Sequence, residues 1–294
     1  MKYISVSEAA TLWGVSERTV RNYCSLGKIE GAIIKGKNWY IPCDASRPLR
    51  INAAKKYMLL DRLRAEKSSG IKGGIYHQVQ VDLTYNSNHI EGSKLSHDET
   101  RFIYETHTIG ASGNAIPVND IVETINHFRC IDYIIDNAEK RLTDTFIKEL
   151  HRILKSSTSN SSLDWFAVGE YKKLPNQIGG NSTTPPNEVA SSMGELLKCY
   201  NKKSKKTLTD LIEFHHDFEC IHPFQDGNGR VGRLILFKEC LAHKIVPFII
   251  YDDLKYFYYR GLREWNNEHG FLVDTILSAQ DRFKKLLDYF KIEY

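Results

Sequence analysis

The chain has 294 residues, of which 41% are hydrophobic and 26% are charged. This length exceeds that of a typical single domain, so we expect two domains. The 40 Lys and Arg residues exceed the 36 Asp and Glu residues, and the whole surplus lies in residues 1–50, which hold eight basic and four acidic side chains. Residues 51–294 hold 32 of each sign, which excludes a bulk electrostatic attraction of this segment to nucleic acid.

The sequence begins without the apolar stretch of a signal peptide, and no uninterrupted apolar run reaches about 18 residues, the length that spans a bilayer. The six cysteines are scattered, with no Cys-x-x-Cys pair and no Cys/His cluster at zinc spacing. Such cysteines are typical of small core residues in a reducing compartment. We therefore expect a soluble, cytoplasmic protein that has no membrane partner.

Residues 5–27 predict two short helices joined by a tight turn. The first ends at Trp13, Gly14 and Val15 form the turn, and Ser16 is the expected N-cap of a helix over residues 17–25. Two short apolar segments, 32–34 and 39–41, then flank Lys35-Gly36-Lys37-Asn38, which predicts a hairpin with a basic tip.

This module, residues 1–48, resembles the winged helix-turn-helix of excisionase and MerR-type DNA-binding domains. The resemblance implies that the second helix enters the major groove and that the wing touches the DNA backbone. The residues it would bring to DNA are Arg18, Thr19, Arg21, Lys35 and Lys37. The alternative is a module that binds protein or orders a dimer. So few phosphate contacts make DNA binding weak unless the chain forms a homodimer.

A linker is expected between the two domains. Pro48 closes the first module, residues 53–65 predict a helix, and Ser68-Ser69-Gly70 with Gly73-Gly74 predict a flexible join. We therefore assign residues 49–75 to a helical linker and residues 76–294 to the second domain.

The second domain is predicted to be mainly α. Ser96 and Glu99 form a capping box, and apolar residues recur at helical spacing in the segments that follow. The predicted helices cover residues 98–105, 118–136, 143–154, 187–200, 208–220, 253–267 and 273–290. Residues 155–187 break this pattern, and Gly169–Gly180 within them predicts a short β-hairpin. The alternative for that stretch is a plain surface loop.

A hydroxyl and a carboxylate lie one helical turn apart at Ser87 and Glu91, followed by Gly92 as a helix stop. Taken alone, this pattern is typical of many helix ends.

The most informative run is His222-Pro223-Phe224-Gln225-Asp226-Gly227-Asn228-Gly229-Arg230-Val231-Gly232-Arg233. Pro223 ends the preceding helix, so the run joins one helix to the N-terminus of the next, whose first N–H groups lack partners. The glycines let an oxyanion approach these amides, and the helix dipole favours negative charge there. Separately, each feature is most often only a turn, a helix stop or a solvated face; together they are much rarer.

The side chains of this run favour phosphoryl or nucleotidyl transfer to a hydroxyl. Arg230 and Arg233 lie three residues apart, where two guanidinium groups repel unless an anion such as polyphosphate lies between them. Asp226 offers a hard oxygen ligand for Mg²⁺. His222 has an ordinary pKa of about 6.5 and can take a proton from a hydroxyl near neutral pH.

The run resembles the Fic motif, His-Pro-Phe-x-Asp/Glu-Gly-Asn-Gly-Arg-x-x-Arg, at every specified position. Fic proteins typically transfer AMP from ATP to a Ser, Thr or Tyr hydroxyl of a target protein. The resemblance implies a Fic fold with ATP and Mg²⁺ as substrate and cofactor, His222 as general base and Asp226 as the metal ligand. It further implies that the amides of Gly227, Asn228 and Gly229 bind the triphosphate with Arg230, and that Arg233 takes the γ-phosphate.

Three weaker features gain a meaning from the same resemblance. Ser87 and Glu91 resemble the Ser/Thr-x-x-x-Glu inhibitory motif, whose Glu pairs with the second motif arginine and displaces the γ-phosphate. The hairpin resembles the Fic flap, which covers the nucleotide and pairs with the target segment, so Gln177 and Ile178 are expected beside ATP. Downstream, the resemblance makes adenine-binding candidates of Tyr258, Tyr259 and Asn266, although most of that aromatic stripe is predicted core.

Other functions stay open. The same site would also suit UMP transfer, or removal of AMP by water that Glu91 activates. A different class is a DNA-binding transcriptional regulator whose Fic half senses nucleotide or modifies the chain itself. The sequence names neither the target protein nor the DNA site.

Overall fold

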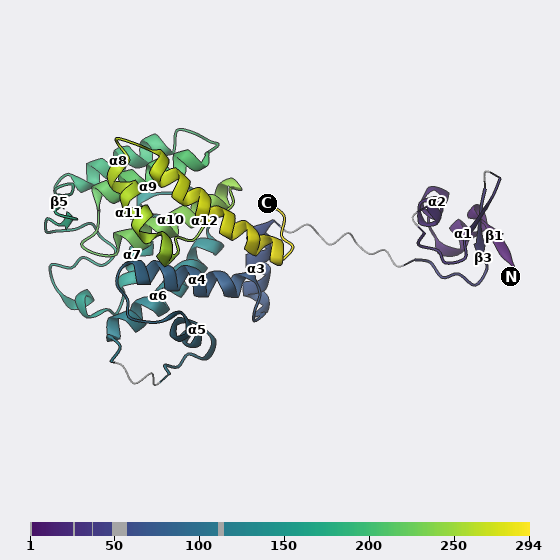
Figure 1. Ribbon diagram of the computed structural model, residues 1–294, viewed down its shortest axis with the longest axis horizontal. Helices are drawn as coiled ribbons and strands as arrows, with labels where there is room; N and C mark the ends of the chain where they lie inside the picture. The colour runs from purple at the N-terminus through teal and green to yellow at the C-terminus, as the bar shows by residue number, and fades with distance from the viewer. Residues whose placement is uncertain (1, 26, 37, 49–57, 111–114) are drawn as a thin grey trace. The chain divides into compact units, whose positions relative to one another are not determined.

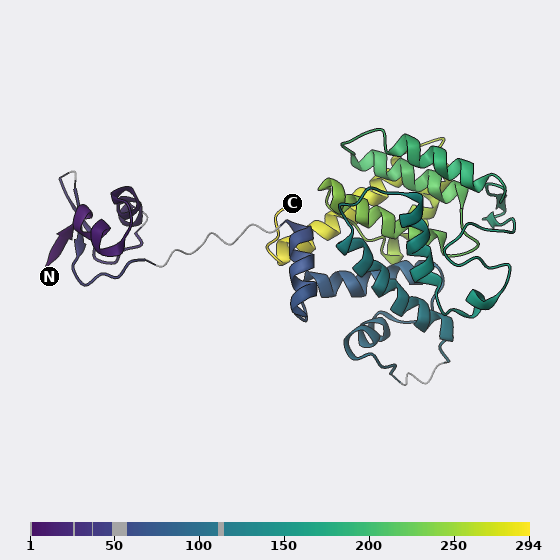
Figure 2. The same cartoon turned by 180° about the vertical axis from the view of Figure 1, so that it is seen from behind.

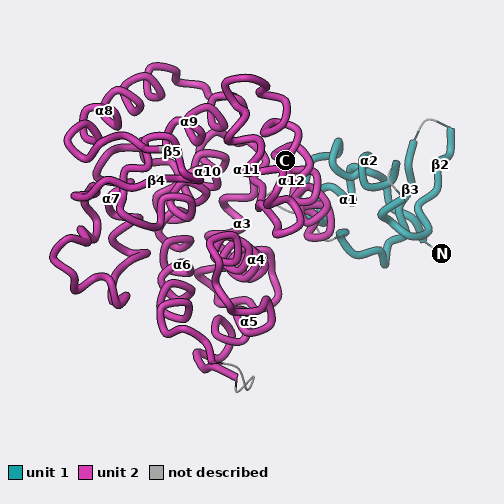
Figure 3. The backbone as a smooth tube through the Cα atoms, turned by 60° about the vertical axis from the view of Figure 1, so that its left-hand side comes forward, with its two compact units in different colours: residues 1–56 teal, residues 57–294 magenta. Residues whose placement is uncertain are grey.

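The computed structural model describes residues 2–25, 27–36, 38–48, 58–110 and 115–294. The chain divides into two compact units, residues 1–56 and residues 57–294, coloured separately in Figure 3. Each unit has its own hydrophobic core, as expected for a chain with two domains.

The first unit contains a helix pair packed on a three-stranded sheet. Its elements are β1 (Tyr3–Ser5), α1 (Val6–Trp13), α2 (Glu17–Ser25), β2 (Ile33–Lys35) and β3 (Asn38–Pro42). The strand order is β1-β3-β2, and both pairings are antiparallel, with Tyr40 opposite Ser5 on one side and Ile33 on the other. The two helices and the hairpin agree with the sequence prediction. Strand β1 was not predicted, because three residues are too short to display an alternating pattern.

The helix α3 (Leu59–Ser69) belongs to the second unit and corrects the expected linker of residues 49–75. Leu63 is fully buried in the second core, and α3 packs against α4 (Ile75–Ile90) and α6 (Val118–Asp136). The buried Glu66 carboxylate also accepts a hydrogen bond of 2.9 Å from the backbone of Tyr76. The helix was predicted over residues 53–65, of which 53–57 lie outside the described residues.

The remaining elements of the second unit follow the predicted helical order. They are α5 (His97–Thr106), α7 (Asp144–Lys155), η1 (Ser159–Ser162), β4 (Gln177–Ile178), β5 (Asn181–Ser182), α8 (Val189–Tyr200), α9 (Leu208–Ile221), α10 (Asn228–His243), η2 (Asp252–Leu254), α11 (Lys255–Glu264) and α12 (Gly270–Tyr289). The capping box of Ser96 and Glu99 opens α5 as predicted. The short hairpin is also present, since Ile178 pairs with Asn181 across Gly179 and Gly180, both of which have positive φ.

Helix α10 lies in the middle of the second unit, as Figures 1 and 2 show from opposite sides. It packs against α4, α6, α7 and α9, and its residues are buried on every face. Val231, Leu234 and Ile235 belong to the core shared with α6 and α7. Because the helix is enclosed in this way, its N-terminus is held at a fixed place at the edge of the core.

No helix in the described ranges is both long enough and apolar enough to cross a bilayer. The cysteines differ in part from the expectation of core residues: Cys24, Cys130 and Cys240 are buried, whereas Cys43, Cys199 and Cys220 are exposed. All six are free thiols.

Candidate active site

His222 lies at the exit of α9, in the left-handed conformation (φ 51°, ψ 61°), and its N–H still donates to the carbonyl of Phe218 at 2.9 Å. Pro223 cannot donate the next helical hydrogen bond, so the chain leaves the helix at this point. Burial and the nearby Lys172 lower the pKa of His222 to about 4, against an opposing effect of the Glu219 backbone. The ring is therefore uncharged at neutral pH and free to accept a proton.

The loop between α9 and α10 is held by buried side chains. The Asn228 side chain accepts a hydrogen bond from the N–H of Phe224 and donates one to its carbonyl, each at 2.8 Å. The buried ring of His151 donates from Nε2 to the carbonyl of Asp226 at 3.1 Å and stacks on Phe224 with centroids 4.0 Å apart. The Asn228 amide is thus used within the loop, and only its backbone N–H remains for a ligand.

The N-terminus of α10 has a backbone geometry that suits an anion. Gly227 precedes the helix at φ 83°, a conformation that favours glycine, and the first N–H groups of the helix have no helical acceptor. A Cβ at Gly229 would collide with the Glu91 carboxylate and lie 2.9 Å from Arg233. Gly229 therefore allows a carboxylate from another helix to come onto this N-terminus.

That carboxylate belongs to Glu91, the C-cap of α4, which forms an ion pair of 2.7 Å with Arg233. Arg233 is buried, and its other donors bond the hydroxyl of Ser87 at 3.0 Å and the Ser87 carbonyl at 2.9 Å. Burial opposes the charge of Glu91, but Arg233 and then Arg230 lower its pKa below the ordinary value. The residues predicted as an inhibitory pair thus lie beside the motif arginine.

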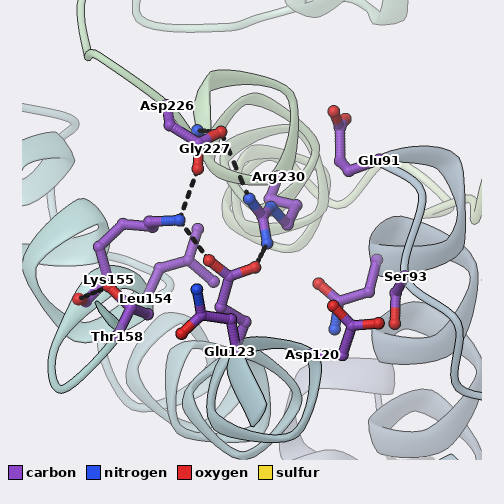
Figure 4. Close-up of polar contacts among 12 residues, drawn as sticks. Glu91, Ser93, Asp120, Glu123, Leu154, Lys155, Thr158, Asp226, Gly227 and Arg230 are labelled. Carbon is purple, nitrogen blue, oxygen red and sulfur yellow. Dashed lines mark hydrogen bonds and ion pairs between the residues drawn. The ribbon is translucent and has the colours of Figure 1, made fainter. Parts of the chain in front are cut away.

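The first motif arginine, Arg230, is bonded to Glu123 of α6, and Glu123 also bonds Lys155 at the end of α7 (Figure 4). Lys155 in turn donates to Asp226 at 2.6 Å. Burial disfavours ionisation of Asp226, yet Arg230, Lys155 and the N–H of Gly227 lower its pKa to about 2, so the carboxylate is charged. Glu123 was not predicted from the sequence, and Lys155 was expected at the start of an irregular segment. The one feature of the sequence that could have indicated both residues is a charged side chain at a helix position that faces the core.

The residues present fit a magnesium ion that arrives with a nucleotide. Among the described residues, no three His, Cys, Asp or Glu side chains lie together as a metal-binding group. Asp226 is ionised, and half of its side chain is exposed. Mg²⁺ usually needs only one or two carboxylates when phosphates complete its shell.

Comparison with known proteins matches residues 141–239 to the Fic/DOC family and residues 3–45 to a helix-turn-helix domain. The first match contains His222 and the whole run to Arg233. The chain carries a Fic/DOC domain. Glu91 and Glu123 precede the matched residues, so their place beside the motif comes from the structure.

Two curated relatives and two solved structures illustrate the likeness. The protein adenylyltransferase Fic of Aedes aegypti is 28% identical over 208 residues, 69% of this chain and 38% of that protein. The protein of the same name from Drosophila melanogaster is 26% identical over 233 residues, 78% of this chain and 44% of that protein. This chain thus spans about two fifths of the length of these relatives.

Among solved structures, a Fic domain containing signalling protein from Bacteroides thetaiotaomicron has a TM-score of 0.62 at 22% identity, covering 78% of this chain and 94% of that chain. Fic-1 from C. elegans has a TM-score of 0.64 at 18% identity, covering 79% and 71%. This chain shares the Fic fold with both.

The hairpin of the Fic/DOC domain is tied to the motif loop by Lys172. Its backbone donates to the carbonyl of Pro223 at 2.8 Å, and its Nζ donates to Asn176 at 2.7 Å and to Thr183 at 2.6 Å. Burial lowers the pKa of Lys172 to about 8. Gln177 and Ile178 are exposed at the strand that this anchor supports.

The three adenine candidates do not share one environment. Tyr258 is 1% exposed, lies in a core cluster and shares a hydrogen bond of 2.6 Å with His215, so its contact with adenine stays a prediction. Tyr259 is 41% exposed, and Asn266 is exposed. Sequence alone does not separate these environments, because buried and ligand-facing aromatic residues have the same helical spacing.

A buried carboxyl of α9, Glu219, also went unpredicted. A Cβ at Gly232 would lie 2.6 Å from its Oε1 and 2.8 Å from the ring of His215, so any larger residue there would have to displace one of these two side chains. Burial raises the pKa of Glu219 to about 8, despite the opposing charge of Arg233, which makes it a neutral acid at physiological pH.

In the helix-turn-helix domain the residues predicted to contact DNA differ in their exposure and in their partners. Arg18 and Lys35 are exposed, while Arg21 is exposed but pairs with Glu17 at 2.6 Å. Thr19 shares a hydrogen bond of 2.9 Å with the Ser16 hydroxyl at the start of α2, so its side chain supports the helix end. Lys37 lies outside the described residues.

Proposed function

We propose that this chain is a protein adenylyltransferase, which transfers AMP from ATP to a Ser, Thr or Tyr hydroxyl of a target protein or of the chain itself. The observation that carries the proposal is an uncharged His222 at the end of α9, followed directly by a glycine-flanked helix N-terminus with two buried arginines. The names of the curated relatives point to the same activity.

In the proposed reaction His222 takes the proton of the acceptor hydroxyl through Nε2. The hydroxyl oxygen forms a bond to the α-phosphorus, the bond between that phosphorus and the bridging oxygen breaks, and pyrophosphate leaves with the electron pair. The amides at the start of α10 and the Arg230 guanidinium stabilise the charge on the phosphate oxygens. Such transfer depends mainly on positioning and on charge stabilisation.

Asp226 would hold magnesium together with the phosphates. When bound, the ion supplies positive charge between phosphate oxygens. The ionised state of Asp226 and its half-exposed side chain support this role.

Glu91 would keep the enzyme inactive. Its carboxylate already neutralises Arg233 and lies over Gly229, at the N-terminus that a phosphate would use. A γ-phosphate and Glu91 cannot both occupy this place, since two anions would share one guanidinium. ATP would then bind with its α-phosphate out of line, and transfer would begin only when Glu91 withdraws.

The target's hydroxyl segment would dock on the hairpin as an added strand. The hairpin strands are only two residues long, and Gln177 and Ile178 are exposed on one of them. An extended peptide gains main-chain hydrogen bonds from such an edge, with little demand on its sequence.

The test is label transfer from ATP that carries the radiolabel at the α-phosphate, with the γ-labelled nucleotide as control. Glu91→Gly is expected to label itself strongly with the first nucleotide and not with the second. His222→Ala in the same background is expected to abolish labelling. Equal labelling by wild type and Glu91→Gly would remove the inhibitory claim, and labelling that survives His222→Ala would remove the general base.

Two related reactions use the same residues. Transfer of UMP and removal of AMP, with Glu91 activating water, are separated from AMP transfer by comparing label from several nucleotides with release of AMP from a modified target. AMP removal would need Glu91 for activity, so Glu91→Gly would lose it rather than gain it.

A second candidate function is DNA-binding regulation, in which the Fic/DOC domain senses nucleotide or modifies the chain. The match of residues 3–45 to a helix-turn-helix domain and the exposed Arg18 and Lys35 favour it. Salt-dependent binding to DNA upstream of its own gene would support this function, and no mobility shift at low salt would count against it.

A further inference from the structure

Four charged side chains in the second unit close a ring of alternating sign (Figure 4). Lys155 Nζ bonds one oxygen of Glu123 and lies 2.6 Å from Oδ2 of Asp226. Arg230 bonds the other oxygen of Glu123 and lies 3.6 Å from Oδ1 of Asp226. Each carboxylate is therefore shared by the same two cations, and the ring has no net charge.

The ring is buried except at one corner. The exposed fraction of the side chain is 2% for Lys155, 6% for Arg230 and 12% for Glu123, but 49% for Asp226. The Lys155 stem packs against Gly227, where an added Cβ would lie 3.4 Å from its Cδ. A ligand from solvent therefore meets the ring first at Asp226.

Three helices and one loop build this arrangement. Glu123 comes from α6, Lys155 from the last residue of α7, and the other two from the motif loop and α10. Buried charges are costly unless paired, so removing one member would leave a partner uncompensated. The ring accordingly fixes the direction of Arg230 and Asp226 before any nucleotide arrives.

The Lys155 ammonium occupies the place between the carboxylates of Glu123 and Asp226. Two carboxylates that bond the same ammonium are arranged as they would be around a small divalent cation, because both cations attract hard oxygen ligands. While the ammonium stays there, its charge repels a metal ion, and one accessible Asp226 side chain is a poor site without phosphates.

We propose that Lys155 is a positioning residue that keeps divalent metal off the two carboxylates until the nucleotide brings it, and that Glu123 holds Lys155 and Arg230 in place for this purpose. The inference rests on the proposed role of Asp226 as the magnesium ligand. It goes beyond that role by assigning the order of binding and two residues outside the Fic motif. If Lys155 had only a structural role, its replacement would change the stability of the fold and leave metal binding unchanged.

The test uses the full chain, without nucleotide, and Mn²⁺ as the probe, followed by the electron paramagnetic resonance signal of the free ion. Lys155→Met vacates the place between the carboxylates, so it is expected to bind one Mn²⁺ about tenfold or more tightly than wild type. Lys155→Arg keeps the positive charge and is expected to behave as wild type. Adding Asp226→Asn to Lys155→Met is expected to remove the new site.

A matched control lies on the same helix. Lys148 also bonds two carboxylates, Asp144 at 3.2 Å and Glu170 at 3.0 Å, but their side chains are 46% and 67% exposed and are free to separate in solvent, so Lys148→Met is expected to leave Mn²⁺ binding unchanged. Equal Mn²⁺ affinity of wild type and Lys155→Met would overturn the proposal, as would equal gains at Lys148 and Lys155.

A second variant keeps the proposal falsifiable if Lys155→Met does not fold. Lys155→Gln also removes the ammonium but can still donate a hydrogen bond to either carboxylate, so it is expected to bind Mn²⁺ more tightly than wild type. Unchanged or weaker binding would overturn the proposal. Neither measurement needs catalysis, so label transfer by Glu91→Gly tests the proposed function separately.

Discussion

Replacing Asn228 by alanine tests how the motif loop is held. The side chain bonds both the N–H and the carbonyl of Phe224, at 2.8 Å each, and is 1% exposed. The carbonyl keeps a second donor, Asn176 at 2.9 Å, so only the N–H is left unpaired. An orphaned buried donor costs about 1–3 kcal/mol and the lost second bond about 1 kcal/mol, which together give about 2–4 kcal/mol.

Urea denaturation measures this loss, and Asn137→Ala provides the matched control. Asn137 is part-buried and donates one hydrogen bond, to Tyr133 at 2.8 Å, so its replacement is expected to cost about 1 kcal/mol. Asn228→Asp keeps the acceptor but places a carboxylate oxygen against the Phe224 carbonyl, so it is expected to destabilise at least as much at neutral pH. If Asn228→Ala cost no more than Asn137→Ala, the loop would not depend on this side chain.

Further predictions concern protonation and DNA. For Glu91→Gly, kcat/KM for ATP is expected to stay constant from pH 7.5 to about 5 and to fall near the His222 pKa of about 4. Lys172→Met removes a charge that lowers this pKa, so it is expected to move the fall to higher pH. A midpoint near pH 6.5 in Glu91→Gly would contradict a buried, neutral His222 ring. In the folded chain the pKa of Glu219 is raised to about 8, whereas in the unfolded chain it has the ordinary value of about 4.5. Between these values only the folded chain keeps the proton, so the Glu219 contribution to the free energy of unfolding declines as the pH rises from 4.5 to 8. Glu219→Gln is therefore expected to gain stability relative to wild type between pH 5 and 8 in urea titrations, whereas a constant difference would refute a neutral Glu219. Arg18→Ala is expected to weaken DNA binding and to lower its salt slope by about one, and an unchanged slope would exclude that phosphate contact.

Local pattern and family resemblance were sufficient for much of the fold. Helix α6 matches its predicted bounds, and the capping box of Ser96 and the turn at Gly14 define helix ends through short-range hydrogen bonds. The boundary near residue 57 was missed because the sequence of α3 gives no sign of which core buries Leu63. Burial of that kind is a tertiary property.

The residues of the candidate site that are contiguous in sequence could be predicted, whereas those brought together only by the fold could not. His222 and the loop to Arg233 are contiguous, so their chemistry could be inferred from one run of sequence. The counter-ions could not, since Glu123 and Lys155 come from other helices and meet Arg230 and Asp226 only in the fold. The pKa of about 4 for His222 likewise depends on burial and on Lys172, which lies fifty residues upstream.

The most direct measurement of the central claim is a crystal structure of Glu91→Gly with ATP and magnesium. The account predicts phosphates on the first amides of α10, the γ-phosphate on Arg233 where Glu91 lies in the wild type, and His222 facing the α-phosphate. A nucleotide bound elsewhere, or a His222 ring turned away from the phosphates into the core, would contradict it.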